Sequence, residues 1–94
     1  YYKSDEDKDR TSSSKALGHS ILDKVLESTS AKSRGVKQGN LAVIRETKMP
    51  AVLIEGGFLT NADEMDKIKD PDYVKKLSWG IAQGIDDYLT KKTS

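Results

Sequence analysis

The chain has 94 residues, enough for at most one small domain near the lower limit of independent stability. Its 16 basic and 15 acidic side chains nearly cancel, so the composition favours neither a nucleic-acid partner nor an anionic membrane surface. Because it contains no long apolar run and no signal-peptide pattern, we expect no membrane span and no export address within these residues. Cysteine is absent and histidine occurs once. This excludes disulfides and makes a zinc site built from this chain alone uncommon.

The first part of the chain predicts a strand, a polar loop and a helix. Tyr1 and Tyr2 are good strand residues, and their place at the very start suggests part of a larger domain. Residues 3–14 are rich in charge and serine, which is typical of a solvated loop. A helix is predicted over about 13–28, capped by one of the serines at 12–14. Its apolar stripe at helical spacing consists of Leu17, Ile21, Leu22, Val25 and Leu26.

The single histidine, His19, lies off that stripe and four residues before Asp23 on the polar side. We therefore interpret it as an exposed side chain with an acidic neighbour rather than as a metal ligand, and we predict no metal ligand in this chain.

Two apolar runs are candidate core strands. Residues 41–44, L-A-V-I, follow a Gly-Asn turn signal, and residues 51–54, A-V-L-I, follow Pro50. The second run is too short for a helix and rich in branched side chains. It predicts a strand buried on both faces, as in the middle of a parallel sheet.

A carboxylate ends the second run, and it is the lead candidate for a functional residue. Glu55 is followed at once by Gly56 and Gly57. A charge at this place is costly unless the strand has just emerged into a polar cleft, and ligand sites of α/β sheets lie at the carboxyl ends of strands. The two glycines allow close approach of another group, so we include them as candidate substrate-binding residues. Arg45, which also follows an apolar run, either reaches the same cleft or is an ordinary surface arginine.

The last third of the chain predicts two helices. Residues 61–64, N-A-D-E, resemble a capping box that opens a short helix. Asp70-Pro71 is the start signal of a long helix, followed by a flexible tail at 91–94. We interpret Tyr73 and Trp79 as packing residues, and Gly80 and Gly84 as permitting close approach of the helix to the sheet. The apolar stripe of this helix consists of Val74, Leu77, Ile81, Ile85, Tyr88 and Leu89.

The predicted order is strand, helix, strand, strand, short helix, long helix. Buried strands and helices that each need an apolar partner predict an α/β fold, with a mixed or mostly parallel sheet layered with helices. Over 1–94 this is a partial domain.

The segment from Asn40 to Glu64, N-L-A-V-I-R-E-T-K-M-P-A-V-L-I-E-G-G-F-L-T-N-A-D-E, resembles the C-terminal half of the zinc-dependent N-acetylmuramoyl-L-alanine amidases of bacterial cell walls. The likeness extends to Tyr1-Tyr2, to the R-G-V-K segment and to the closing helix, so it covers essentially the whole chain. In that family the glutamate of the P-A-V-L-x-E-x-G-F block is a catalytic residue beside the zinc. The resemblance places that role on Glu55.

The resemblance implies a secreted bacterial hydrolase of the autolysin type, located outside the cell in the wall or the periplasm. Its substrate would be peptidoglycan, and zinc-activated water would cleave the amide bond between N-acetylmuramic acid and L-alanine. The two histidines and the glutamate that hold the family's zinc lie upstream, and their motifs are not in this chain. We therefore expect zinc as cofactor of the complete domain, the missing N-terminal half as a partner, and an isolated fragment that is inactive.

Two alternatives remain open at this stage. The first is a non-catalytic amidase-like module that binds wall glycan or a protein. The second is a structural α/β domain in which Glu55 belongs to a buried ion pair; the glycines after it argue against that role.

Overall fold

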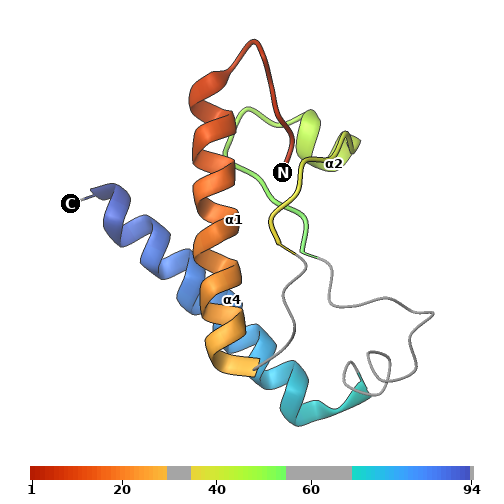
Figure 1. Ribbon diagram of the computed structural model, residues 1–94, viewed down its shortest axis with the longest axis vertical. Coiled ribbons are helices and arrows are strands. Elements are labelled where there is room, and N and C mark those ends of the chain that lie inside the picture. The colour runs from red at the N-terminus through yellow and green to blue at the C-terminus, as the bar shows by residue number, and fades with distance from the viewer. Residues whose placement is uncertain (30–34, 55–68, 94) are drawn as a thin grey trace.

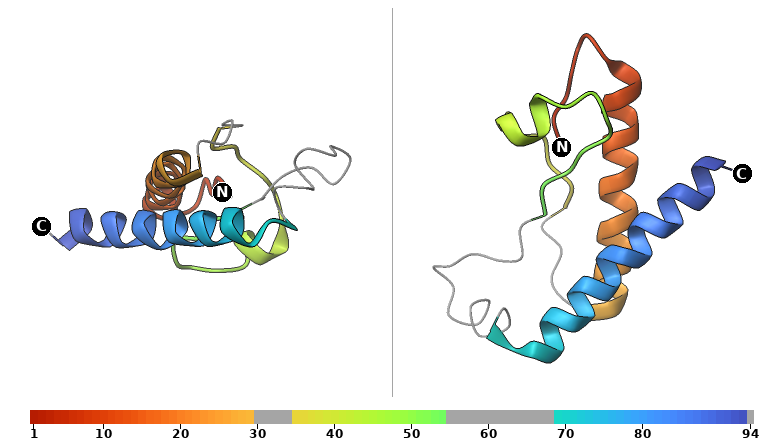
Figure 2. Two further views of the ribbon diagram at one scale, coloured as in Figure 1. Left: turned by 90° about the horizontal axis from the view of Figure 1, so that it is seen from below. Right: turned by 180° about the vertical axis from the view of Figure 1, so that it is seen from behind.

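The computed structural model describes residues 1–29, 35–54 and 69–93 of the chain. Its helices are α1 (Lys8–Thr29), the single-turn α2 (Ala42–Arg45) and α4 (Pro71–Thr93). The two long helices cross in contact, while the first residues and the segment 35–54 lie together along one side of α1 (Figure 1). Figure 2 shows the same arrangement from below and from behind. None of the helices in the described ranges has the length and apolar character that a membrane crossing requires.

Helix α1 begins earlier than the serine cap predicted, because an aspartate caps it instead. Asp7 Oδ1 accepts a hydrogen bond from the Arg10 N–H at 2.9 Å, and the Asp7 carbonyl accepts one from the Thr11 N–H at 3.1 Å. The Ser4 hydroxyl accepts from the Asp7 N–H at 3.1 Å, which holds the entering chain. A carboxylate at this end also complements the helix dipole. The helix therefore takes up residues 8–14, which were predicted as loop.

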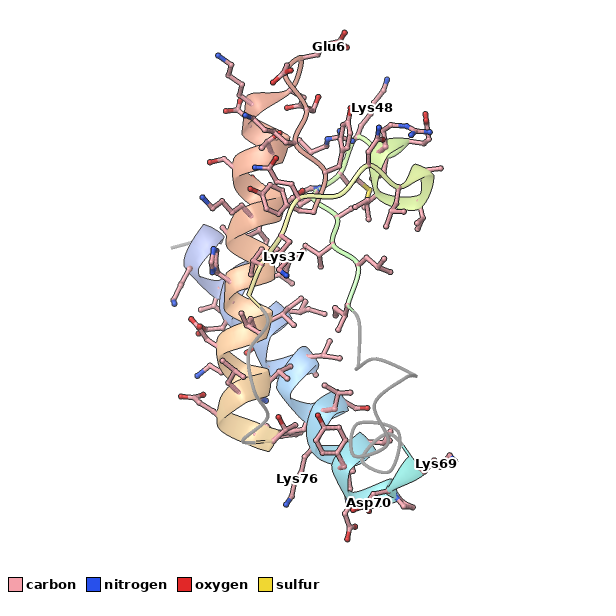
Figure 3. All side chains as sticks on the ribbon, turned by 45° about the vertical axis from the view of Figure 1, so that its right-hand side comes forward. Glu6, Lys37, Lys48, Lys69, Asp70 and Lys76 are labelled. Atoms are coloured by element: carbon pink, nitrogen blue, oxygen red, sulfur yellow. The ribbon has the colours of Figure 1, made fainter. Side chains whose placement is uncertain are left out.

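Helix α4 begins where the Asp-Pro pair predicted. Asp70 Oδ1 accepts a hydrogen bond from the Asp72 N–H at 3.0 Å, and the Asp70 carbonyl accepts one from Val74 at 3.0 Å. Pro71 occupies the first helical position, where its missing N–H has no intrahelical partner to lose. Figure 3 shows Asp70 at this end of the helix. The helix continues to Thr93, so it includes most of the predicted tail.

Two glycines bring α4 into backbone contact with α1. A Cβ on Gly84 would lie 2.8 Å from the Ile21 backbone nitrogen, and one on Gly80 would lie 2.8 Å from the Val25 Cα. The Ser20 hydroxyl donates to the Gly84 carbonyl at 2.7 Å, and the Ser28 hydroxyl donates to the Lys76 carbonyl at 2.5 Å. Later residues of α1 meet earlier residues of α4, so the helices run antiparallel. The predicted close approach is present, but its partner is α1 and not a sheet.

The predicted α/β fold is wrong for the part of the chain that the structure describes, which is helical and contains no β-strand. Residues 42–45 form α2 instead of a strand, with the Arg45 N–H bonded to the Leu41 carbonyl at 2.8 Å. A short apolar run does not distinguish a buried strand from a helical turn. With no neighbouring strand to pair with, local i→i−4 bonding satisfies the backbone.

Residues 51–54 form no strand with any of the described residues, and this too differs from the prediction of a strand buried on both faces. Leu53 is 46% exposed and Ile54 is 42% exposed. The Ala51 N–H donates to the Ser14 hydroxyl of α1 at 3.0 Å rather than to another strand. Each extended residue needs a partner outside its own segment for its backbone groups. The described residues supply one such partner here, and it is a side chain.

Tyr1 makes the nearest approach to sheet pairing. Its amino group donates to the Lys37 carbonyl at 2.9 Å, and its carbonyl accepts from the Gly39 N–H at 2.8 Å. One residue that bonds to two residues flanking the same position is the pattern of a parallel ladder. The pairing consists of this single step, so the strand predicted at Tyr1 and Tyr2 does not form.

Candidate functional site

The lead candidates Glu55, Gly56 and Gly57 lie outside the described residues, so the catalytic role of Glu55 stays a prediction. The described segment 35–54 ends at Ile54, the residue before the carboxylate. The start of this segment is held against α1 by the hydrogen bond from Ala51 to Ser14. Ser14 is 3% exposed. The approach to the candidate carboxylate is therefore anchored on the long N-terminal helix.

Arg45 ends α2, and its guanidinium has two local partners. Its Nε lies 2.7 Å from Glu46 Oε1, and its Nη1 donates to Asn40 Oδ1 at 2.8 Å. The Arg45 carbonyl accepts from Arg10 Nη1 at 3.2 Å, which ties this turn to α1. The Arg45 side chain is 38% exposed. The predicted proximity of Arg45 to Glu55 stays a prediction, because Glu55 lies outside the described ranges.

The residues that the structure describes do not fit a metal ion. They contain no group of three or more histidine, cysteine or acidic side chains arranged to hold one. His19 is exposed on α1, as its position off the apolar stripe predicted.

Sequence analysis missed one exposed aromatic side chain. Trp79 is 64% exposed on α4, although we interpreted it as a packing residue. Its position in the sequence predicts this exposure. Trp79 follows Leu77 of the apolar stripe by two residues, or about 200° around the helix, which places it on the polar side.

The chain belongs to the N-acetylmuramoyl-L-alanine amidase family, whose sequence model matches residues 1–87. The match covers nearly the whole chain and confirms the resemblance given by the motif around Glu55.

Individual relatives are also named as amidases. The chain is 36% identical over 94 residues to an uncharacterised cell wall amidase of Bacillus anthracis, an alignment that covers 98% of this chain and 18% of that protein. It is 35% identical over 75 residues to a sporulation-specific N-acetylmuramoyl-L-alanine amidase of Bacillus subtilis, covering 79% and 29%. It is 35% identical over 79 residues to the amidase LytC of Bacillus subtilis, covering 84% and 16%.

The chain thus spans less than half of the length of the curated relatives that it matches. No solved structure matches it.

Proposed function

We propose that the protein to which this chain belongs hydrolyses the amide bond between N-acetylmuramic acid and L-alanine in peptidoglycan. The observation that carries the proposal is the family match over residues 1–87, which includes the motif from Pro50 to Asn61. The names of two relatives, both N-acetylmuramoyl-L-alanine amidases, agree with it. The protein would act at the cell wall, outside the cytoplasm, as a secreted enzyme of the autolysin type.

Glu55 is the residue that we assign to the chemistry. A carboxylate at the end of an apolar segment can take a proton from the attacking water and return one to the leaving amine. Gly56 and Gly57 carry no side chain, so they leave room for the substrate backbone beside it. Each of these three assignments rests on the motif alone.

Arg45 is proposed as a substrate-binding residue. Its two local contacts, to Glu46 and Asn40, hold the guanidinium in one orientation. A fixed orientation lowers the entropy lost when an anionic group binds. The carboxylates of the peptide stems of peptidoglycan are such groups.

Zinc is the cofactor that the family resemblance implies, and its ligands are proposed to lie outside this chain. The described residues hold no suitable cluster, so we derive no catalytic step through the ion from them. Bound zinc would polarise the scissile carbonyl and activate water. We expect this chain alone to be inactive, because the motifs that hold the family's zinc are not among its 94 residues.

The test replaces Glu55 by glutamine in the complete protein. Glutamine keeps the size of the side chain and one acceptor but removes the charge and the titrating proton. We expect release of L-alanine-containing peptides from purified peptidoglycan to fall by at least about 10²-fold. Zinc content and the melting temperature should stay at the wild-type values.

Each contrary result points to a different role. Loss of zinc in the Glu55→Gln variant would make Glu55 a metal ligand, and unfolding would support the buried ion pair. Near-full activity with zinc bound would remove the catalytic assignment. A complete wild-type protein that binds peptidoglycan but releases no peptide would leave the non-catalytic module as the function.

A further inference from the structure

A hollow between α1 and α4 lies beside the exposed tryptophan. It is open to solvent and has a volume of about 380 Å³. Residues near the end of α1 line one wall and residues from the middle of α4 line the other. The lining residues are Lys24, Glu27, Ser28, Trp79, Gly80 and Gln83.

Trp79 differs from the other exposed apolar side chains of α4. Val74, Ile85 and Leu89 are 40%, 40% and 53% exposed, and all three belong to the apolar stripe of the helix. Trp79 lies on the polar side instead. Any cover over the stripe would bury those three side chains and leave the indole in solvent. The hydration of an exposed apolar ring is unfavourable, so a ligand that covers the ring gains free energy by removing it from water.

The polar groups beside the ring are placed as hydrogen-bonding partners. Gln83 lies one turn after Trp79 on the same side of α4 and offers both a donor and an acceptor. Lys24 Nζ and Glu27 Oε2, 3.2 Å apart, form an ion pair on the opposite wall. The Ser28 hydroxyl donates to the Lys76 carbonyl and keeps its acceptor lone pairs. Figure 3 shows Lys76 on the outside of α4.

We propose that this hollow is a saccharide-binding subsite that takes N-acetylated sugars of a glycan strand. The C–H face of a pyranose ring stacks on the Trp79 indole, while its hydroxyl and N-acetyl groups bond to Gln83 and to the Lys24–Glu27 pair. The choice of a wall glycan as ligand rests on the proposed function. The subsite binds sugar but carries out no chemistry, and it holds the polymer on the helical side of the domain.

The charges around the ring favour a sugar over an apolar protein surface. An apolar partner covering Trp79 would also cover Lys24 and Glu27, whose side chains are 36% and 69% exposed. Taking them out of water without new hydrogen bonds carries a large desolvation penalty. A sugar replaces the lost water contacts with its own hydroxyl groups.

The test uses the fluorescence of Trp79, the single tryptophan of these 94 residues, in the complete protein with any other tryptophan replaced by phenylalanine. The probe is chitohexaose, a soluble chain of N-acetylglucosamine that has no amide bond to L-alanine. We expect a saturable shift of the Trp79 emission, with a dissociation constant on the order of 1 mM. By calorimetry, Trp79→Ala and Gln83→Ala should each weaken binding by at least about tenfold.

Two controls test whether the binding belongs to this hollow and to N-acetylated sugars. Leu89→Ala removes a similarly exposed apolar side chain from the stripe of the same helix and should leave binding unchanged. Maltohexaose, which lacks N-acetyl groups, should bind more weakly. Because chitohexaose is not a substrate of the amidase reaction, this binding test is independent of whether the protein cleaves peptidoglycan.

Three results would overturn the proposal. One is no saturable change in the Trp79 emission at millimolar chitohexaose. Another is binding that survives both Trp79→Ala and Gln83→Ala. The third is an emission that changes with protein concentration and not with sugar, which would assign the face to a second copy of the chain.

Discussion

The helix pair α1–α4 and the segment 35–54 are held in place in different ways. The pair meets backbone to backbone at Gly80 and Gly84. The segment is tied to α1 by two hydrogen bonds, from Ala51 to Ser14 and from Arg10 to Arg45. Each helix satisfies its own backbone groups and needs a neighbour only for its apolar face. An extended segment needs a neighbour both for its backbone groups and for its apolar side chains, so it depends on residues distant in the sequence.

Burial follows the same division. Ile21, at the crossing of the two helices, is 4% exposed. The segment buries Ile44 to the same degree, but most of its large apolar side chains stay in contact with water. Those that are exposed are Leu41, Val43, Met49, Leu53 and Ile54. The helix crossing is therefore the closer contact, while the segment is held to α1 by individual hydrogen bonds and by the Val36 and Val52 side chains beside Gly18.

The largest effect on stability is expected from Gly84→Ala. The added Cβ would lie 2.8 Å from the Ile21 backbone nitrogen and 2.9 Å from the Ser20 carbonyl oxygen, so the helices must separate. Overpacking costs about 1–3 kcal/mol and sometimes more. The gain in helix propensity, about 1 kcal/mol, offsets part of it. Because the Cβ would meet backbone atoms, which cannot rotate away, we expect the high end of that range. The net loss should be about 2 kcal/mol or more in urea denaturation of the chain, followed by circular dichroism.

The matched control is Gly39→Ala in the segment, where an added Cβ meets nothing within 4 Å. This substitution should leave stability unchanged or raise it by up to about 1 kcal/mol, since alanine restricts the unfolded chain. Equal losses for Gly84→Ala and Gly39→Ala would contradict the close crossing of the two helices.

A smaller effect is expected from Ser14→Ala, which cuts the link between the two regions. The buried Ser14 hydroxyl accepts the Ala51 N–H, and alanine would leave that donor without its partner. An unsatisfied donor costs about 1–3 kcal/mol, and access of water to the half-buried Ala51 should keep the loss near 1 kcal/mol. Amide hydrogen exchange at Ala51 should accelerate at the same time. Ser12→Ala, on the exposed side of α1, is the control; faster exchange at Ala51 in that variant too would argue against the bond.

The difference between the two regions also explains what could be predicted from the sequence. The predicted start of α4 is correct because the capping by Asp70 and the fixed backbone angle of Pro71 depend only on residues within one helical turn. The apolar stripe of α1 correctly predicted a helix. The serines at 12–14 predicted too late a start, because Asp7 is the residue that caps the helix. The sheet was wrong because strand propensity depends on neighbours that the local pattern does not contain. Gly80 and Gly84 correctly predicted a close approach, but the predicted partner was a sheet, whereas α1 lies there in the structure.

The candidate site divides in the same way. The family was found from a local motif around Glu55, and the family model confirms it. The geometry around that carboxylate lies outside the described residues, and the spacing of the motif alone does not give it. Trp79 is exposed although aromatic residues in helices usually pack, because its angle to the apolar stripe places it on the polar side of α4. That angle is readable from the sequence, so the interpretation of Trp79 as a packing residue was avoidable.

The smallest effect is expected from Leu53→Ala, and it separates an exposed segment from a buried strand most cleanly. A strand buried on both faces would lose about 2–5 kcal/mol when leucine becomes alanine, from lost transfer energy and the cavity left behind. In the structure Leu53 is 46% exposed, so little is lost and no closed cavity forms. We expect a change within about 0.5 kcal/mol, the usual range for surface substitutions, in urea denaturation of the 94-residue chain. Ile44→Ala is the control from the same segment, since Ile44 is 4% exposed, and its loss should exceed that of Leu53→Ala by about 2 kcal/mol. A loss above about 2 kcal/mol for Leu53→Ala would mean that the side chain is buried and that the segment packs as a core strand after all.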